Sequence, residues 1–397
     1  MSEASTEAAP KRPYIGGQAV LEGVMMRSPT SFAVVVRRRD GSLHVRERSM
    51  PDGRTGLAKL PLVRGVASLV ESLKLGSEAL RFSGDLMERD LEAEEAEEAA
   101  KKAKAAKAGG AASSILGAFR GLGMTLFALL TAADGDSAGA ASTSTSAEAE
   151  KKGGKAGMTL MLILMVGFLV ALPQATAEGA NKLFGLGLDR QSPAFQAMTG
   201  GFKLLIVVGY MLAIRRMEAI RRVFQYHGAE HKTISTYEAR EELTVANARA
   251  KTTLHPRCGT TFLIMIVLVS VLVFTLVGGF LPKIETGKAA LDSAIFFAVK
   301  LPFLPLIAAF TFELQRVFAR YCTTGPLRVL LWPGFLCQKI TTIEPDDQQL
   351  EVALASLRVT LFREEGVEKG EGGERADVRY ASFDALMKSP KLRRAAA

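Results

Sequence analysis

The stretch TTFLIMIVLVSVLVFTLVGGFL, from Thr260 to Leu281, contains no charged residue. A helix needs about 20 apolar residues to cross a bilayer, so an uncharged run of this length is typical of a transmembrane span. The whole chain is 48% hydrophobic and 23% charged, which resembles an ordinary globular protein. Charge is nevertheless excluded from a few long runs and concentrated between them. We therefore expect a mainly α membrane protein, and we exclude a water-soluble fold, a disordered chain and a disulfide scaffold with its 3 Cys.

Three further apolar runs bring the predicted number of spans to about four. The last of them carries Lys300 near one end, where a lysine can extend its ammonium toward water, and Pro302, which membrane helices tolerate. The additional predicted spans are Met158 to Ala177, Met198 to Ile214, and Ala294 to Phe312.

Basic residues in the short loops predict the orientation of these spans. They gather just before the first span and in loop 215–258, whereas loops 178–197 and 282–293 carry few of them, offset by acids. Cytoplasmic loops are enriched in Lys and Arg, so we expect a multi-pass protein with both termini in the cytoplasm. The net charge of +9 is then explained by orientation, since the cations flank spans. Membrane lipids are the expected partners, and nucleic acid is not. The basic residues concerned are Lys151, Lys152, Lys155, Arg215, Arg216, Arg221, Arg222 and Lys232.

Polar segments surround this membrane domain. A β-hairpin is predicted from Phe32 to Arg48, because Asp40-Gly41 separates two β-rich runs. Residues 115–131 are apolar but interrupted by Arg120, which favours an interfacial helix, with a fifth span as the alternative. The predicted order is a disordered N-terminus (1–13), a hairpin with an amphipathic helix (14–83), a charged helix, interfacial helix and flexible linker (84–157), the membrane domain (158–312), a cytoplasmic or interfacial region (313–363) and a disordered tail (364–397).

Three of the 4 histidines lie close together in the cytoplasmic loop. His227 and His231 belong to the pattern H-x-x-E-H, with Glu230 between them. Positions i and i+4 share one face of a helix, so both imidazoles can bind one metal ion. In this inverted-zincin order the carboxylate acts as a general base on a bound water. We therefore predict a divalent metal, with zinc the first choice, and Glu230 as the catalytic residue.

The third and fourth ligands stay open at this point. His255 and Cys258 lie three residues apart around a proline and can each close the coordination from a turn. If both bind, zinc is saturated and has no position for water, which makes the metal structural. Glu313, at the cytoplasmic end of the last predicted span, is a candidate ligand or partner of a metal-bound histidine, with an ion pair to Arg316 as the alternative.

Several motifs resemble the YqhQ-type bacterial membrane proteins, a family of unknown function whose members are described as predicted metal-dependent enzymes. The resemblance covers most of residues 14–360 and implies a protein of the bacterial inner membrane with a metal site; it implies no substrate. The matching stretches are Gly16 to Arg27 (GGQAVLEGVMMR), His227 to Lys232 (HGAEHK), His255 to Thr260 (HPRCGT), Pro333 to Lys339, and Glu344 to Asp346 (EPD).

The first of these motifs has no phosphate-loop spacing, so nucleotide binding is not expected. Its polar side chains, Gln18, Glu22 and Arg27, are candidates for contact with a partner, and a structured turn before the hairpin is the alternative. For the whole chain, metal-dependent hydrolysis of a membrane-proximal substrate is the leading hypothesis. A non-catalytic scaffold or assembly factor with a structural metal comes second, and a transporter third, because the spans contain few charges.

Overall fold

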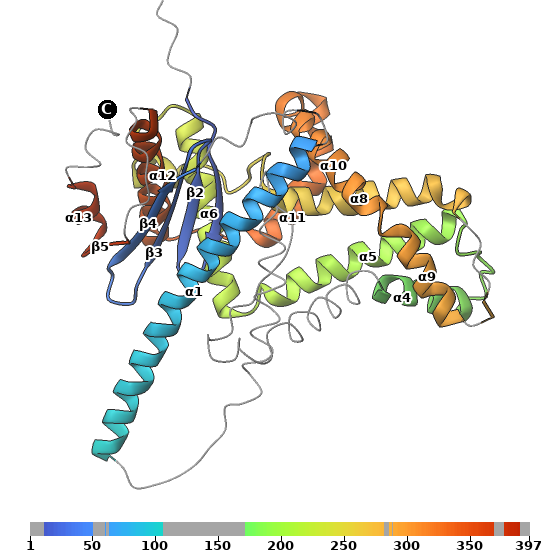
Figure 1. Cartoon of the computed structure of the whole chain (residues 1–397), viewed down its shortest axis with the longest axis horizontal. Helices are drawn as coiled ribbons and strands as arrows, with labels where there is room; N and C mark the ends of the chain where they lie inside the picture. Colours follow the sequence, from blue (N-terminus) through green and yellow to red (C-terminus); the bar gives the residue numbers. More distant parts are fainter. Residues whose placement is uncertain are drawn as a thin grey trace, which may run out of the picture.

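The computed structural model describes residues 12–50, 60, 63–105, 171–281, 286–287, 289–368 and 377–389. It consists of an α/β unit from which a group of apolar helices projects (Figure 1). The predicted interfacial helix (115–131) and flexible linker lie outside the described residues, as do residues 1–11 of the N-terminus and most of the first predicted span.

A five-stranded antiparallel sheet forms the centre of the α/β unit. Its strands follow chain order, and the predicted hairpin is confirmed, with Arg37 paired to Leu43 and Gly41 at a positive φ of 80° in the turn. Residues 16–27, predicted as a turn or a contact surface, instead form a second hairpin. The strands are β1 (Gly16–Val20), β2 (Gly23–Arg27), β3 (Ser31–Arg37), β4 (Leu43–Ser49) and β5 (Val378–Tyr380).

Helices cover both faces of this sheet. On one face, α1 (Val63–Ala105) packs Leu75 and Phe82 against the strands. On the other face lie α6 (Glu218–Glu238) and α12 (Asp347–Glu368). Successive strand side chains point to opposite faces, so this double cover explains why β2 and β3 are apolar along almost their whole length.

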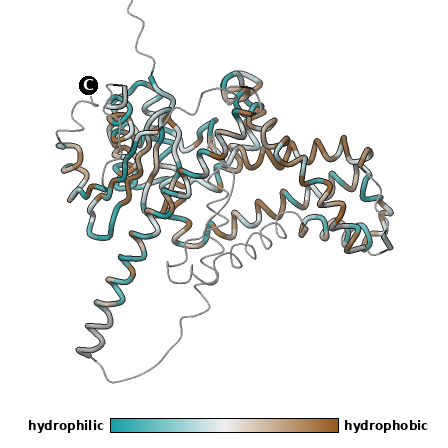
Figure 2. The backbone as a smooth tube through the Cα atoms, viewed as in Figure 1, coloured by the Kyte–Doolittle hydropathy of each residue, from teal (hydrophilic) through white to brown (hydrophobic). Residues whose placement is uncertain are grey.

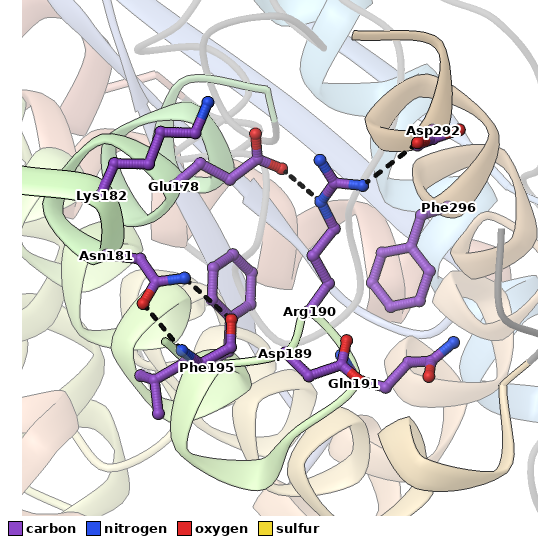
Figure 3. Close-up of a pocket in the computed structure, with 10 residues that line it drawn as sticks. Glu178, Asn181, Lys182, Asp189, Arg190, Gln191, Phe195, Asp292 and Phe296 are labelled. Atoms are coloured by element: carbon purple, nitrogen blue, oxygen red, sulfur yellow. Dashed lines mark hydrogen bonds and ion pairs between the residues drawn. The ribbon is translucent and has the colours of Figure 1, made fainter. Parts of the chain in front are cut away.

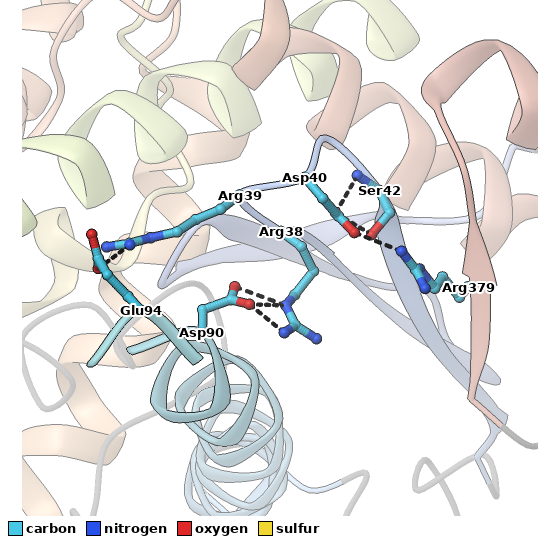
Figure 4. A network of polar contacts seen from close by, with 7 residues as sticks. All are labelled: Arg38, Arg39, Asp40, Ser42, Asp90, Glu94 and Arg379. Carbon is cyan, nitrogen blue, oxygen red and sulfur yellow. Dashed lines mark hydrogen bonds and ion pairs between the residues drawn. The ribbon is translucent and has the colours of Figure 1, made fainter. Parts of the chain in front are cut away.

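Ion pairs attach α1 to the tip of the β3–β4 hairpin (Figure 4). Arg38 binds Asp90 of α1 in bidentate fashion, with Nε 2.7 Å from each carboxylate oxygen, and Arg39 pairs with Glu94. Asp40 accepts from Ser42 and pairs with Arg379 of β5. The charged segment predicted as a separate helix is thus the continuation of one helix of 43 residues.

Among the described residues, two helices are long and apolar enough to cross a membrane. They are α5 (Pro193–Ile214) and α8 (Gly259–Val277), which η4 (Gly278–Phe280) extends. Figure 2 shows apolar residues along most of α8. Only 22% and 39% of their most apolar parts are buried, so most of this surface faces outward. The group also contains α4 (Leu172–Leu183), α9 (Ala289–Lys300), α10 (Phe303–Tyr321), η5 (Pro326–Leu331) and α11 (Trp332–Thr341).

The fourth predicted span is not one continuous helix in the structure, because residues 294–312 are divided between α9 and α10. The chain breaks between α9 and α10, at Leu301 and Pro302. Proline has no backbone N–H and disfavours helical geometry in the residue before it, which explains the break. The described residues therefore contain two candidate membrane helices and not four.

Helix α5 covers the third predicted span and ends at Ile214, and α6 begins at Glu218, after an extended Met217. The tail was expected to be disordered from residue 364. Instead α12 reaches Glu368, and β5 and α13 (Phe383–Met387) follow it, with β5 paired to β4.

The close approach of α6 to the segment before α12 gives a test of this packing. A Cβ added at Gly228 would lie 2.2 Å from the carbonyl oxygen of Ile343, which is backbone and cannot move away alone. We expect Gly228→Ala to lower the free energy of unfolding by about 1–3 kcal/mol, as overpacking does. Thermal unfolding of the purified protein measures this.

Gly84→Ala in α1 is the matched control, because a Cβ there meets no atom within 4 Å. Exchange of glycine for alanine inside a helix stabilises by about 0.5–1 kcal/mol, so this variant should unfold at an equal or higher temperature. A Gly228→Ala protein as stable as the Gly84→Ala protein would contradict the described packing of α6.

Candidate metal centre

Helix α6 positions the two histidines of the H-x-x-E-H pattern side by side. His227 and His231 are one turn apart, and their ring centroids are 4.4 Å apart in a T-shaped arrangement. Each of the two residues is only 1% exposed. Burial follows from the location of α6, which is covered by the sheet on one side and by the segment between α11 and α12 on another.

Backbone carbonyls orient both imidazoles. Nδ1 of His227 lies 3.0 Å from the carbonyl oxygen of Thr341, and Nδ1 of His231 lies 2.5 Å from that of Thr253. A carbonyl only accepts hydrogen bonds, so each Nδ1 carries the proton and donates. In a neutral ring held in this way, Nε2 carries the lone pair that can bind a metal, as in metal-bound histidines whose other nitrogen donates to a carbonyl.

Cys258 completes a group of three buried donors. Its Sγ lies 3.2 Å from Nε2 of His227 and 3.1 Å from the hydroxyl oxygen of Thr260. One ligand atom from each of His227, His231 and Cys258 lies within 4.8 Å of the others. Cys258 also occupies the N-cap position of α8, without a capping hydrogen bond from its side chain, and the helix dipole there favours the anionic thiolate that binds metals.

The donor atoms themselves fit a metal ion. Nε2 of His231 is buried and makes no hydrogen bond with any residue that the structure describes. Burial lowers the pKa of His231 well below its usual value, and the neighbouring His227 and His255 lower it further. The ring therefore stays neutral, which is the form that coordinates a metal. His227, His231 and Cys258 together can hold a metal ion.

His255 lies next to this group and lines the same cavity, but its Nε2 contacts Glu238. Its ring centroid is 5.7 Å from that of His231, and its Nε2 lies 3.4 Å from a carboxylate oxygen of Glu238. Its backbone is held by the amide of Gln338, which accepts from N–H of His255 and donates to its carbonyl oxygen at 2.8 and 2.7 Å. Of the two candidates around the proline, the structure groups Cys258 with the histidine pair.

Glu230 faces a small cavity beside the donors. The cavity has a volume of about 20 Å³ and is lined by Glu230, His231 and Cys258, together with Gly17 of β1. A Cβ at Gly17 would lie 2.8 Å from both Cγ and Oε1 of Glu230, so glycine at this position leaves room for the carboxylate. About 10–15 Å³ suffices for one water, and the cavity is therefore large enough for one water molecule.

The remaining predicted residues make contacts within the chain. Glu313 pairs with Arg64 of α1, with Oε1 2.6 Å from Nε. Glu22 pairs with Arg222 of α6, and Arg27 lies 3.5 Å from Glu71 of α1. Gln18 is buried against Gly76 of α1. Contact of Gln18, Glu22 and Arg27 with a partner stays a prediction.

Several residues that shape the site were not predicted from the sequence. Thr253 and Thr341 act through backbone carbonyls, which leave no residue-type signal. Gln315 of α10 donates to the carbonyl oxygen of Cys258 at 3.0 Å, and Lys232 pairs with Glu344. The last contact joins two of the quoted motifs, HGAEHK and EPD.

A larger cavity of about 310 Å³ lies at the far end of the helical group, between α4, α5 and α9 (Figure 3). Its central cation, Arg190, lies 3.0 Å from Glu178 and 3.7 Å from Asp292. The side-chain amide of Asn181 donates to the carbonyl oxygen of Leu188 and accepts from its backbone N–H. None of the candidate metal ligands lines this cavity.

The geometry predicts which substitutions remove the metal. We expect His231→Ala and Cys258→Ser to lose most bound metal, since each removes one of three converging donors. His255→Ala should keep it, because that ring is directed toward Glu238. Metal content per purified chain, measured by mass spectrometry, checks all three. Loss of metal from His255→Ala together with retention in Cys258→Ser would contradict the donor set.

Comparison with known proteins gives a family but no activity. The chain is 28% identical to "Uncharacterized protein YqhQ" of Bacillus subtilis (strain 168) over 357 residues, which are 88% of this chain and 92% of that protein. No solved structure matches the chain. A family model described as "Protein of unknown function (DUF1385)" matches residues 60–363. Since this match spans more than half of the chain, the protein belongs to the DUF1385 family of proteins of unknown function.

Proposed function

We propose that this protein is a metal-dependent hydrolase of the bacterial inner membrane that acts at the cytoplasmic membrane surface. One observation carries the proposal. Two of the three buried donors, Cys258 and His231 with its unpartnered Nε2, line a cavity for a single water that Glu230 also lines. Three protein ligands with one remaining position are the pattern of catalytic zinc, whereas structural zinc has four protein ligands.

Zinc suits the donors better than a hard cation does. Two imidazole nitrogens and one thiolate form a borderline-soft set, which favours zinc over magnesium or calcium. Bound there, zinc would lower the pKa of a coordinated water and so supply a nucleophile at neutral pH.

The chain's own residues would perform the remaining steps. Glu230 would accept the proton of the water in the cavity, and Gly17 keeps the space that its carboxylate needs. The carbonyls of Thr341 and Thr253 hold the imidazoles in the tautomer that presents Nε2. Arg27 and Arg257 line the same cavity, so a substrate that approaches it from outside would be favoured if it carries negative charge.

The membrane location is supported by the two apolar helices. Both α5 and α8 expose large apolar side chains, such as Leu205 and Leu276, which lipid would cover. Cys258 directly precedes α8, so the metal group would lie close to the membrane surface. With the positive-inside orientation, this surface and both termini are cytoplasmic, and the four-span arrangement remains part of the proposal. A lipid-linked or other membrane-proximal substrate follows from that location.

One observation favours a second candidate, a non-catalytic scaffold or assembly factor with a structural metal. The cavity beside the donors accommodates a water but not a substrate. In that case the metal joins α6 to the start of α8, and Glu230 has no chemical role.

Replacement of Glu230 by Gln separates these candidates. We expect a protein that keeps its metal and its stability but loses function, because an amide cannot accept the proton. In cells that lack the native gene, the Glu230→Gln protein should cause accumulation of the substrate, detected by comparison of lipid and metabolite extracts with those of the wild type. The measurement is made at equal protein level and equal metal content.

Two controls accompany this comparison. Glu241→Gln changes a carboxylate that pairs with Lys251 at the surface, away from the cavity, and should behave as wild type. His231→Ala should cause the same accumulation as Glu230→Gln, with loss of metal. A metal-loaded Glu230→Gln protein whose extracts match those of the wild type, while His231→Ala fails, would reject the hydrolase and favour the scaffold.

A further inference from the structure

Exposed apolar side chains gather where α10 ends and α11 begins. Trp332 is 59% exposed, and Val329 is 60% exposed. The large apolar residues that pack against the sheet are, by contrast, mostly buried. We call this set the apolar platform. Its members are Tyr321, Leu327, Val329, Leu330, Trp332 and Leu336.

The segment that carries the platform is amphipathic and firmly attached. On the opposite side of α11, Gly334, Cys337 and Gln338 are buried. A Cβ at Gly334 would lie 2.3 Å from Cγ2 of Thr261, so α11 packs directly on the first turn of α8 (Figure 1). Cys337 packs with Met211 of α5. One face is thus fixed to both candidate membrane helices, and the other is open.

The charged residues of the segment that carries the platform all have one sign. From Val317 to Ile343 the sequence contains no Asp or Glu, whereas Arg320, Arg328 and Lys339 are present. Arg328 lies over the ring of Phe335 at 5.8 Å, and Arg320 lies over that of Tyr321 at 5.4 Å. Aromatic side chains with flanking cations are typical of the layer between water and the acyl chains, where anionic phospholipids attract Arg and Lys.

We propose that the apolar platform inserts into the cytoplasmic headgroup layer of a bilayer that contains anionic phospholipids. The proposal rests on the membrane location given under the proposed function and adds a specific contact surface to it. A second copy of the chain fits less well, because contact between two platforms would bring arginines of like charge together.

The platform would also set the depth of the metal group in the membrane. The carbonyl of Thr341, at the end of α11, orients His227, and Gln338 of the same helix holds His255. Arg215 of the turn after α5 donates to the carbonyl oxygens of Lys339 and Ile340, at 2.5 and 2.7 Å. Insertion of the exposed face of α11 would therefore hold the metal donors His227, His231 and Cys258, which lie beside its buried face, close to the lipid headgroups. A substrate in the headgroup layer would then be within reach of the metal.

Trp332 tests this directly, because the chain contains 1 Trp. The full-length protein is reconstituted into phosphatidylcholine vesicles with phosphatidylglycerol, and Trp fluorescence is recorded. We expect emission at shorter wavelength than in water, strong quenching by lipids brominated near the headgroup, and little quenching by acrylamide. Quenching by acrylamide without quenching by brominated lipid would overturn the proposal. Protection from both quenchers would overturn it too, because protein would then cover the platform.

A relocated tryptophan is the matched control. The double variant Trp332→Phe with Tyr380→Trp moves the probe to β5 in the α/β unit, where acrylamide should quench it and brominated lipid should not. The variant Arg320→Gln with Arg328→Gln should reduce quenching by brominated phosphatidylglycerol to the level given by brominated phosphatidylcholine. Equal preference for the anionic lipid in this variant and the wild type would contradict the role of the arginines.

These outcomes remain separate from the proposed function. Resistance of the reconstituted protein to extraction at high pH tests whether it is integral to the membrane, and metal content tests the donors. A protein that stays in the vesicles with its metal, yet exposes Trp332 to acrylamide, would refute the platform alone.

Discussion

The structure depends on the burial of two imidazoles on one helix, α6, with both Nδ1 atoms held by carbonyls of other segments. Buried polar groups are costly unless they are satisfied, so the surroundings must supply a partner for each nitrogen. Carbonyls supply one per ring, and Cys258 lies next to Nε2 of His227. Nε2 of His231 is the remaining atom, and a metal ion is the partner that would satisfy it together with the thiol.

This constraint explains why distant motifs meet around α6. Gly17 of β1 gives space to Glu230, and Gly228 lets α6 approach the carbonyl of Ile343. Lys232 is only 3% exposed, and its buried ammonium group is paired with the carboxylate of Glu344 from the EPD motif. Asp346 and Gln349 then cap the start of α12 reciprocally, which fixes the segment that also contacts α6. The five quoted motifs are therefore parts of one packing arrangement around the donors.

Local sequence patterns predicted those features that are determined by residues close together along the chain. The i, i+4 spacing placed His227 and His231 on one helical face, the Asp40-Gly41 pair predicted a hairpin, and the uncharged run predicted α8. Contacts between distant segments were not predictable in this way. Glu313 pairs with Arg64, 249 residues away, and the direction of the His255 ring depends on Glu238 and on a backbone held by Gln338. A continuous fourth span was predicted because membrane helices tolerate proline, whereas the chain breaks before α10 at Pro302.

X-ray absorption spectroscopy at the metal edge of the purified protein tests the central claim, that His227, His231 and Cys258 bind one ion. The account predicts one sulfur at about 2.3 Å and two imidazole nitrogens at about 2.0–2.1 Å from zinc, with one further light atom from water. A protein isolated without metal, or a metal bound to nitrogen and oxygen with no sulfur, would contradict the account.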